Sequence, residues 1–425
     1  MQKEVILSIA YGNYTLGSGG TDKAILSQQR MFSKAGFEYI YIFPFWKIGK
    51  ISLCSSRNRW GVIRNGRFLF VKETASLISW IISNYTNLKE IHIHHLMYLN
   101  ISELNFIIDA FQARIRFFLH DYYTICSNYN LLYNDKKFCG AEKRSDNKCS
   151  GCYYYSNKIT DIIENKFLEK WKDRLFFVAP SEKAKEIWIN AYPQYRELVH
   201  VVWHQKLRGV YKGNYQRLTS NDEIRVAYVG SPRNIKGFSQ WKKILKECNE
   251  IKDYKFFDFG SGSYLENNVS TIKVDFKKDI NAMIKALRHY EIDCAILWSI
   301  WPETYAYTYY ECFAANAFVI SNYNSGNICN QIQIRKNGIV LSDEEELYSF
   351  LKSPDLLREK INKMRGMKIY GPEELEESEK ILEYAEKEHG IKLDKSCNYA
   401  KRKKKALDLI FSIIYYLLVF VYKFI

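Results

Sequence analysis

The sequence predicts an α/β protein made of two doubly wound, Rossmann-like domains in series, and three observations support this fold class. The chain has 425 residues, a length that suits two or three domains better than one. Short apolar runs alternate with helix-like stretches, as in parallel strands joined by crossover helices. This alternation stops in one polar stretch and then resumes, which indicates a second sheet.

The first predicted domain covers residues 1–205. Its first apolar run, residues 5–10, is too short for a signal peptide and is expected to be a buried strand. The next helix is expected to begin near Thr21 or Asp22, which are good N-caps, and to run toward Gly36. Further strands are expected at 39–43, 67–71, 90–94, 116–119, 175–179 and 200–203.

A polar linker is predicted at residues 206–223, followed by a second domain at 224–372. Its strands are expected at 224–229, 255–259, 271–274, 294–298, 318–321 and 338–341. An acidic terminal helix is predicted over 373–390, packing back toward the first domain.

The net charge of +15 is compatible with a nucleic-acid-binding protein, but its distribution argues against one. Residues 395–425 contain seven Lys or Arg and one acidic residue, Asp408, so this segment contributes +6 of the +15. An anionic membrane surface explains such a cluster at least as well, and we expect no nucleic-acid partner.

The tail at 400–425 is predicted to associate with a membrane, because a basic run at 401–405 precedes an apolar segment. Residues 409–422 are uncharged and span about 21 Å as a helix, which is shorter than the roughly 30 Å of bilayer hydrocarbon. A monotopic anchor over 401–425 is favoured. A tilted span ending near Lys423 and a helix docked on the protein remain open.

Two glutamates form the most informative pattern. Glu303 directly follows the predicted strand 294–298, at the strand end where doubly wound domains bind ligands. Glu311 lies eight residues later, about two turns along the next helix. Ionised carboxylates at these places suit the recognition of sugar hydroxyls, although an amphipathic helix with solvent-facing glutamates would show the same spacing.

This segment resembles the donor-site signature of retaining glycosyltransferases of family 4, which have the GT-B architecture. The match consists of Pro302 before Glu303, Thr304 and Tyr305 after it, and seven residues before Glu311. The resemblance implies that Glu303 contacts the transferred sugar near the reacting carbon and that Glu311 contacts the ribose. Thr304 and Tyr305 are also expected to bind the donor.

A second match lies at residues 229–238, at the end of the first strand of the second domain. The family has an Arg after the Gly of this turn and then a Lys-Gly pair, both directed at the diphosphate. This chain has Lys236 and Gly237 but Ser231 in place of the Arg, so we assign that role to Arg233. A solvated basic loop is the alternative.

His120 follows the predicted strand 116–119, and the resemblance implies that it faces the donor sugar across the cleft. A histidine that only caps the strand end is the alternative. His92, His94 and His95 fit a strand better than a metal cluster, although His95 could line the acceptor side.

A glycine-rich turn at 17–20 opens the first helix and resembles the family's loop beside the donor diphosphate, with Gly19 and Gly20 as the expected contacts. It differs from the dinucleotide fingerprint, because Asp22 stands where the third Gly belongs. A simple tight turn is the alternative.

A Cys-rich loop is predicted at 124–155. Four thiols with one Cys-x-x-Cys pair could bind a structural zinc, and some relatives carry a similar insertion. Free thiols or a partial disulfide are the favoured alternative. The candidate ligands are Cys126, Cys139, Cys149 and Cys152.

The sequence contains no Asp-x-Asp pair for a catalytic metal, so we expect a metal-independent enzyme that requires no cofactor. The resemblance implies a retaining hexosyltransferase that takes sugar from a nucleoside diphosphate sugar. We expect a lipid-linked saccharide acceptor in cell-surface polysaccharide biosynthesis, such as O-antigen or capsule, at the cytoplasmic face of the inner membrane. A non-catalytic sugar-binding or scaffolding subunit and a basic nucleic-acid-binding protein are the alternatives.

Overall fold

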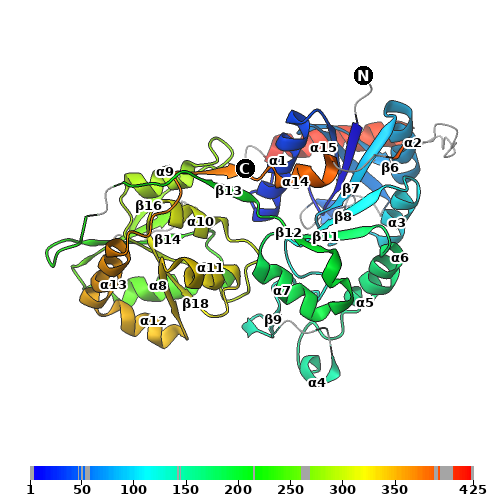
Figure 1. The fold of residues 1–425 in the computed structure, drawn as a ribbon. Helices are drawn as coiled ribbons and strands as arrows, with labels where there is room; N and C mark the ends of the chain where they lie inside the picture. Colours follow the sequence, from blue (N-terminus) through cyan, green and yellow to red (C-terminus); the bar gives the residue numbers. More distant parts are fainter. Residues whose placement is uncertain are drawn as a thin grey trace.

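The computed structural model describes residues 4–45, 47–48, 51–52, 58–140, 143, 145–213, 216–259, 269–386, 391–392 and 405–422. Two α/β domains stand side by side, and the last helices return to the N-terminal domain (Figure 1). Most of the basic run, residues 401–404, and the expected end of a membrane span at Lys423 lie outside the described residues.

The N-terminal domain is built on a nine-stranded sheet with the order β12-β11-β8-β7-β1-β2-β5-β6, and β21 pairs with part of β7. The strands from β12 to β2 are parallel. Their bounds are β1 (Glu4–Ile9), β2 (Glu38–Pro44), β7 (Asn87–Ile93), β8 (Arg114–Phe118), β11 (Leu175–Ala179), β12 (Val199–Val201) and β21 (Ile391–Lys392).

An antiparallel hairpin extends this sheet beyond β2, and the sequence pattern did not predict its first strand. The hairpin consists of β5 (Arg59–Arg64) and β6 (Arg67–Glu73). Asn65 and Gly66 connect the strands with φ values of 47° and 81°. An Asn-Gly turn with both residues at positive φ matches the twist of a two-residue hairpin. The edge strand of the sheet is therefore β6.

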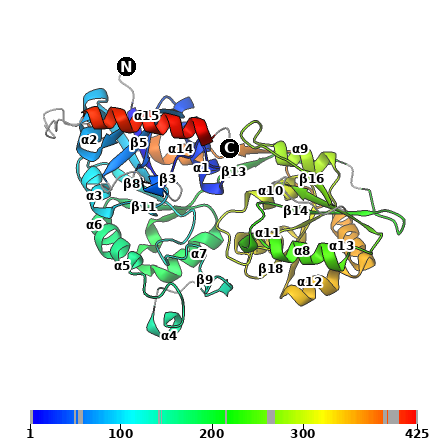
Figure 2. The same ribbon diagram turned by 180° about the vertical axis from the view of Figure 1, so that it is seen from behind.

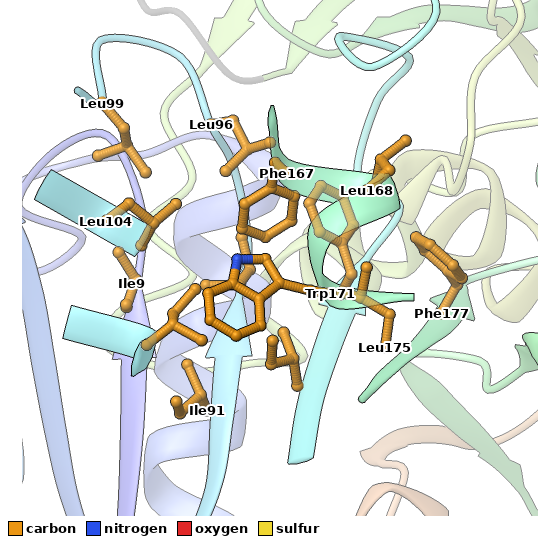
Figure 3. Close-up of a cluster of buried hydrophobic side chains, with 14 of the residues drawn as sticks. Ile9, Ile91, Leu96, Leu99, Leu104, Phe167, Leu168, Trp171, Leu175 and Phe177 are labelled. Atoms are coloured by element: carbon orange, nitrogen blue, oxygen red, sulfur yellow. The ribbon is translucent and has the colours of Figure 1, made fainter. Parts of the chain in front are cut away.

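Helices cover both faces of this sheet. Trp171 lies at the centre of one packed face, among side chains from the strands and from the helical segment before β11 (Figure 3). Its indole Nε1 donates to Asn105 Oδ1 at 2.8 Å, which satisfies its polar atom. The helices are α1 (Gly20–Lys34), α2 (Thr74–Asn84), α3 (Ile101–Asp109), α4 (Asp146–Cys149), α5 (Ile159–Ile163), the π-helix η1 (Glu164–Leu168), α6 (Glu169–Trp171), α7 (Glu182–Ala191) and the 3-10 helix η2 (Pro193–Leu198).

The C-terminal domain has a six-stranded, fully parallel sheet with the order β16-β15-β14-β17-β18-β19. Its strands are β14 (Ile224–Val229), β15 (Tyr254–Phe259), β16 (Val269–Ile272), β17 (Cys294–Ile296), β18 (Phe318–Asn322) and β19 (Gly338–Leu341). Its helices are η3 (Asn234–Lys236), α8 (Phe238–Glu247), α9 (Ala282–His289), α10 (Tyr307–Ala314), α11 (Asn327–Arg335), α12 (Glu344–Leu351) and α13 (Pro354–Gly366).

The expected linker and terminal helix differ from the structure. Residues at the start of the linker form β13 (Gln205–Arg208), which pairs antiparallel with β20 (Glu374–Glu377). The predicted helix over 373–390 therefore begins with a strand, and α14 covers Lys380–Glu386 within the described residues, which do not include 387–390. Pairing with β13 satisfies the backbone of the glutamate-rich segment and overrides its helix propensity.

The start of α1 also differs from the prediction. Its N-cap is Gly19 rather than Thr21 or Asp22. The Asp22 carboxylate lies within the first turn and reaches back to accept from the Gly19 N–H at 3.0 Å. A side chain at the third helical position can satisfy the N-cap in this way.

The two C-terminal helices complete the N-terminal domain. Ile381 of α14 and Tyr415 of α15 (Lys405–Tyr422) are buried in the core on one side of the sheet. Figure 2 shows α15 in red along this domain, and α15 packs against the edge strand β6. Within the described part of the chain, every helix is too short or too polar to cross a membrane.

Candidate functional site

The loop after β17 places Glu303 at the carboxyl end of the parallel sheet, where the sequence predicted it. Glu303 is 3% exposed and forms a parallel bridge with Gly326. Its carbonyl accepts from the Asn327 N–H at 2.9 Å. A Cβ on Gly326, which has a φ of +63°, would lie 2.6 Å from the Glu303 nitrogen, so glycine permits this close approach.

The Glu303 carboxylate is held by two groups of its own domain. Its Oε1 pairs with Lys236 Nζ and accepts from Ser299 Oγ at 2.9 Å. Lys236 ends η3, and Gly237 follows it with a φ of +82° against the Trp298 carbonyl. The Lys-Gly pair of the sequence motif therefore places its amine directly on the first glutamate of the other motif.

Arg233 and Ser231 are both exposed at this turn. The Arg233 charge acts to lower the pKa of Tyr11, although burial is the largest effect and raises that pKa overall. The turn follows β14, so it lies at the same carboxyl end of the parallel sheet as Glu303. This position suits a cation that contacts a ligand held between the domains.

Glu311 pairs with a lysine across the interdomain boundary. It lies on α10 and is 4% exposed. Its Oε1 lies 2.8 Å from Lys23 Nζ of α1, and the side chains of this lysine and glutamate are 11% and 5% exposed. The Lys23 amine also lies 4.4 Å from the centroid of the Tyr307 ring. A buried carboxylate thus receives its counter-charge from the other domain.

Thr304 connects the two domains through its side chain and its backbone. Its Oγ1 donates to the His120 carbonyl at 2.7 Å. Its own carbonyl accepts from Ser181 Oγ, also at 2.7 Å. Tyr305 is buried beside it, with its ring stacked on Tyr310. The residues after Glu303 therefore bind the N-terminal domain in this structure.

His120 follows β8 and belongs to a row of rings. Its Nε2 lies 2.9 Å from His94 Nδ1, so one of these nitrogens donates to the other. The His120 ring also lies 5.5 Å from His204, which stacks on Tyr307 at 5.6 Å. Burial lowers the pKa of His120 well below its usual value, and the neighbouring His204 and His95 lower it further. The His120 ring is neutral near pH 7 as a result.

The glycine-rich turn faces the same boundary. Gly19 and Gly20 are exposed, and a Cβ on Gly20 would lie 3.8 Å from the Tyr307 ring. Burial raises the pKa of Asp22 to about 6, although its hydrogen bond from Gly19 acts in the opposite direction. The N-terminus of α1 thus opens toward α10 of the other domain.

These contacts join into one continuous seam between the domains. It runs from Lys236 and Glu303 through His120 and His204 to the Lys23–Glu311 pair. A small hollow of ≈ 20 Å³ lies beside the second pair and is lined in part by Lys23, His204 and Tyr307. Glu303, Glu311 and Lys236 are not among the residues that line this hollow, so the contacts of the seam, and not one shared cavity, bring the predicted residues into the same region.

Comparison with solved structures gives this architecture a context. The chain is similar to sucrose-phosphate synthase from Thermosynechococcus elongatus, with 11% identity, a TM-score of 0.51, and coverage of 87% of this chain and 95% of that chain. A glycosyltransferase from Rickettsia africae has 16% identity, a TM-score of 0.50, and coverage of 87% and 94%. A TarM variant from S. aureus, solved with fondaparinux, α-GlcNAc-glycerol and UDP, has 10% identity, a TM-score of 0.51, and coverage of 91% and 99%.

The chain has the GT-B fold. The predicted fold class is thereby confirmed. The chain matches no protein-family model and no curated protein sequence. The assignment to glycosyltransferase family 4 therefore stays a prediction.

Within this GT-B fold, three residues of the seam were missed by sequence reasoning. Lys23, His94 and His204 each contact a predicted residue or its helix. Lys23 follows the glycine-rich turn, and His94 belongs to the histidine strand, but neither pattern indicates a partner in another segment. His204 has no recognisable motif.

The Cys-rich loop at 124–155 follows β8 in the chain and contains the four candidate zinc ligands. Cys126 is partly buried, and burial raises its pKa to about 11, with a contribution from the nearby thiols of Cys139, Cys152 and Cys149. Among the described residues, no group of three or more His, Cys, Asp or Glu side chains is arranged to hold a metal ion. The structural zinc stays a prediction.

Proposed function

We propose that this chain is a glycosyltransferase that moves a sugar from a nucleoside diphosphate sugar to an acceptor held between its two domains. The observation that supports this most strongly is the pair of buried carboxylates at the seam, each facing a lysine. Such a set can bind sugar hydroxyls through the carboxylates and phosphates through the amines. UDP in the TarM structure, which has the same fold, supports a nucleoside diphosphate donor.

In this proposal the bound donor replaces some of the contacts that the seam residues make with one another. Lys236 leaves Glu303 for the diphosphate, where Arg233 adds a second cation. Glu303 then accepts from hydroxyls of the transferred sugar, while Glu311 accepts from the ribose. Gly19 and Gly20 offer backbone N–H groups at the start of α1, with Thr304 and Tyr305 on the opposite side.

The chemistry is a substitution at the anomeric carbon. The bond from this carbon to the diphosphate oxygen breaks, and its electron pair leaves with the diphosphate. The acceptor hydroxyl oxygen forms the new bond and transfers its proton to the departing diphosphate. Lys236 and Arg233 stabilise the negative charge, whereas Glu303 and the neutral His120 orient the sugar as positive charge develops.

The finer assignments follow from the family resemblance. We propose a retaining, metal-independent hexosyltransferase of family 4 that acts on a lipid-linked saccharide in the synthesis of O-antigen or capsule. The reaction would take place at the cytoplasmic face of the inner membrane. Metal independence is supported by the cationic side chains and the helix N-terminus at the seam. These groups can stabilise the diphosphate, which is the role of a divalent cation in other folds.

The test is to incubate the purified full chain with a panel of nucleotide sugars and to measure released nucleoside diphosphate. Glu303→Ala should reduce release by at least about 10²-fold, because it removes a contact to the reacting sugar. Glu345→Ala, which removes an exposed carboxylate of α12, is the matched control and should retain wild-type turnover. Wild-type turnover in Glu303→Ala with an intact fold would reject the assignment.

A non-catalytic sugar-binding subunit is the second candidate. The observation that favours it is Ser231, which occupies the position where the family has an Arg. Such a subunit would bind a nucleotide sugar in calorimetry but release no diphosphate, with or without acceptor. Release of diphosphate that requires Arg233 would exclude this candidate.

A further inference from the structure

His94 lies directly behind His120 in the row of rings at the seam. It is 1% exposed, and its ring is stacked on Phe118 with 4.4 Å between the ring centroids. Its Nδ1 lies 2.9 Å from His120 Nε2, and its Nε2 lies 3.5 Å from Tyr39 Oη. These contacts fix the orientation of the His94 ring, so one nitrogen faces His120 and the other faces Tyr39.

Tyr39 and Ser8 determine which nitrogen of His94 carries the proton. The two residues lie on the neighbouring strands β2 and β1, and both are fully buried. Tyr39 Oη donates to Ser8 Oγ at 2.9 Å, because a phenolic hydroxyl is a stronger acid than a serine hydroxyl. The Tyr39 oxygen is then left to accept from His94 Nε2. The proton of His94 therefore lies on Nε2.

Both histidines are neutral near pH 7, so each ring has a single proton to place. Burial lowers the pKa of each well below its usual value, and the neighbouring histidines lower it further. Two nearby carboxylates are already paired with other residues and are not available to stabilise a charged ring. Glu90 pairs with Arg116 at 2.6 Å, and Asp121 pairs with His95 at 2.6 Å.

These contacts assign the tautomer of His120. With its proton on Nε2, His94 can only accept a hydrogen bond at Nδ1. His120 Nε2 must therefore donate its proton to His94, which leaves His120 Nδ1 unprotonated. Within the described part of the chain, His120 Nδ1 has no hydrogen-bond partner. This nitrogen is the acceptor that His120 can offer to a ligand.

We propose that His94 is a positioning residue that holds His120 in the tautomer whose Nδ1 accepts a hydrogen bond, so that His120 binds a sugar hydroxyl as an acceptor. This inference rests on the proposed function, in which His120 orients the transferred sugar. The hydroxyl at His120 must then donate the proton of this hydrogen bond. A sugar with fluorine at that position loses the contact, because fluorine cannot donate. His94 itself contacts no substrate and acts through His120.

The first experiment is ¹⁵N NMR of the full chain with labelled histidine. Nitrogen shifts and two-bond couplings show which ring nitrogen carries the proton, and His120→Ala identifies the His120 signals. We expect a slowly exchanging proton on His120 Nε2 near pH 7. His94→Phe should remove the slow exchange, because Phe has no acceptor. His94→Asn should restore it, because Asn places an oxygen near the position of the lost Nδ1.

Two further variants complete the NMR experiment. Tyr39→Phe removes only the oxygen that accepts from His94, and it should give a mixture of the two His120 tautomers. His289→Phe, at an exposed site, should leave the His120 signals unchanged. A proton on His120 Nδ1 in the wild type would overturn the proposal, and so would a slowly exchanging Nε2 proton that His94→Phe leaves unaltered.

The second experiment measures release of nucleoside diphosphate from donors in which fluorine replaces one sugar hydroxyl at a time. In the wild type, the analogue that lacks the hydroxyl bound by His120 should lose about tenfold in kcat/KM through this contact. This penalty should be absent in His120→Ala, smaller in His94→Phe and regained in His94→Asn. Comparing variants with the same analogue cancels the electronic effect of fluorine on the reaction.

The two experiments separate this inference from the proposed function. Penalties in His94→Phe equal to those of the wild type for every analogue would overturn the positioning role of His94. Release from no donor at all would instead reject the proposed function. The NMR result would still decide the tautomer of His120, because it requires no turnover.

Discussion

The two domains hold the carboxylates of the seam in different ways. Glu303 is paired with Lys236 of its own domain and also accepts from Ser299. Glu311 is paired with Lys23 of the other domain, and the Lys23 amine lies over an aromatic ring. The first pair lies within one domain, whereas the second also links the domains. The same chemical pair therefore has two different consequences.

The largest expected difference in stability comes from Lys23→Met. This variant leaves Glu311 buried without its counter-charge, so we expect a loss of about 3 kcal/mol in the free energy of unfolding. Urea denaturation measures this loss. The double variant Lys23→Met with Glu311→Leu should recover most of it, because an apolar pair has no buried charge.

Lys183→Met is the control for this effect. Lys183 and Glu186 form a pair with side chains 33% and 57% exposed, so its removal should cost well under about 1 kcal/mol. A Lys23→Met variant as stable as the wild type would mean that the link between the domains adds nothing to folding.

The pH dependence of the free energy of unfolding should come from the N-terminal side of the seam, because that side contains the buried histidines. Burial, together with the nearby His120, His92, His204 and Arg116, holds the pKa of His94 well below its usual 6.5. The unfolded chain then binds a proton that the folded chain does not. The unfolded chain gains no advantage from this proton above about pH 6.5. As the pH falls below that value, protonation of the unfolded chain lowers the free energy of unfolding.

His94→Phe tests this expectation. Phe can keep the stacking on Phe118, now 4.4 Å between centroids, but cannot bind a proton. Between pH 7 and pH 5, the free energy of unfolding should fall by about 2 kcal/mol less in this variant than in the wild type. His289→Phe, at an exposed site on α9, should leave the pH profile unchanged. A profile in His94→Phe identical to that of the wild type would contradict the expectation.

The same comparison explains how much could be predicted. Lys236 and Glu303 follow the neighbouring parallel strands β14 and β17, so local motifs and strand order place this pair together. Lys23 is 288 residues from Glu311, and no local sequence pattern predicts that these two residues form an ion pair.

In the fold, too, elements that depend on local sequence could be predicted, whereas contacts between distant segments could not. The parallel strands follow from apolar runs, and most lie within a few residues of their predicted positions. The pairing of β13 with β20 joins two polar segments far apart in the chain. The backbone hydrogen bonds of this pairing override the helix propensity of the second segment, so propensity alone gave the wrong element there. The docking of α15 on β6 likewise depends on Asp408, Ser412 and Tyr415, whose partners lie in the first quarter of the chain.

The smallest expected change in stability comes from Lys236→Met, although its effect on transfer should be large. Glu303 is buried like Glu311, but it retains the Ser299 hydroxyl and its lysine is 28% exposed, so we expect a loss of about 2 kcal/mol, smaller than that of Lys23→Met. Release of nucleoside diphosphate should fall by about 10²-fold, because the cation for the departing phosphate is gone. Lys242→Met, on the exposed side of α8, should alter neither quantity. A stability loss equal to that of Lys23→Met would show that the two pairs have the same structural role, and unchanged release would remove Lys236 from the donor site.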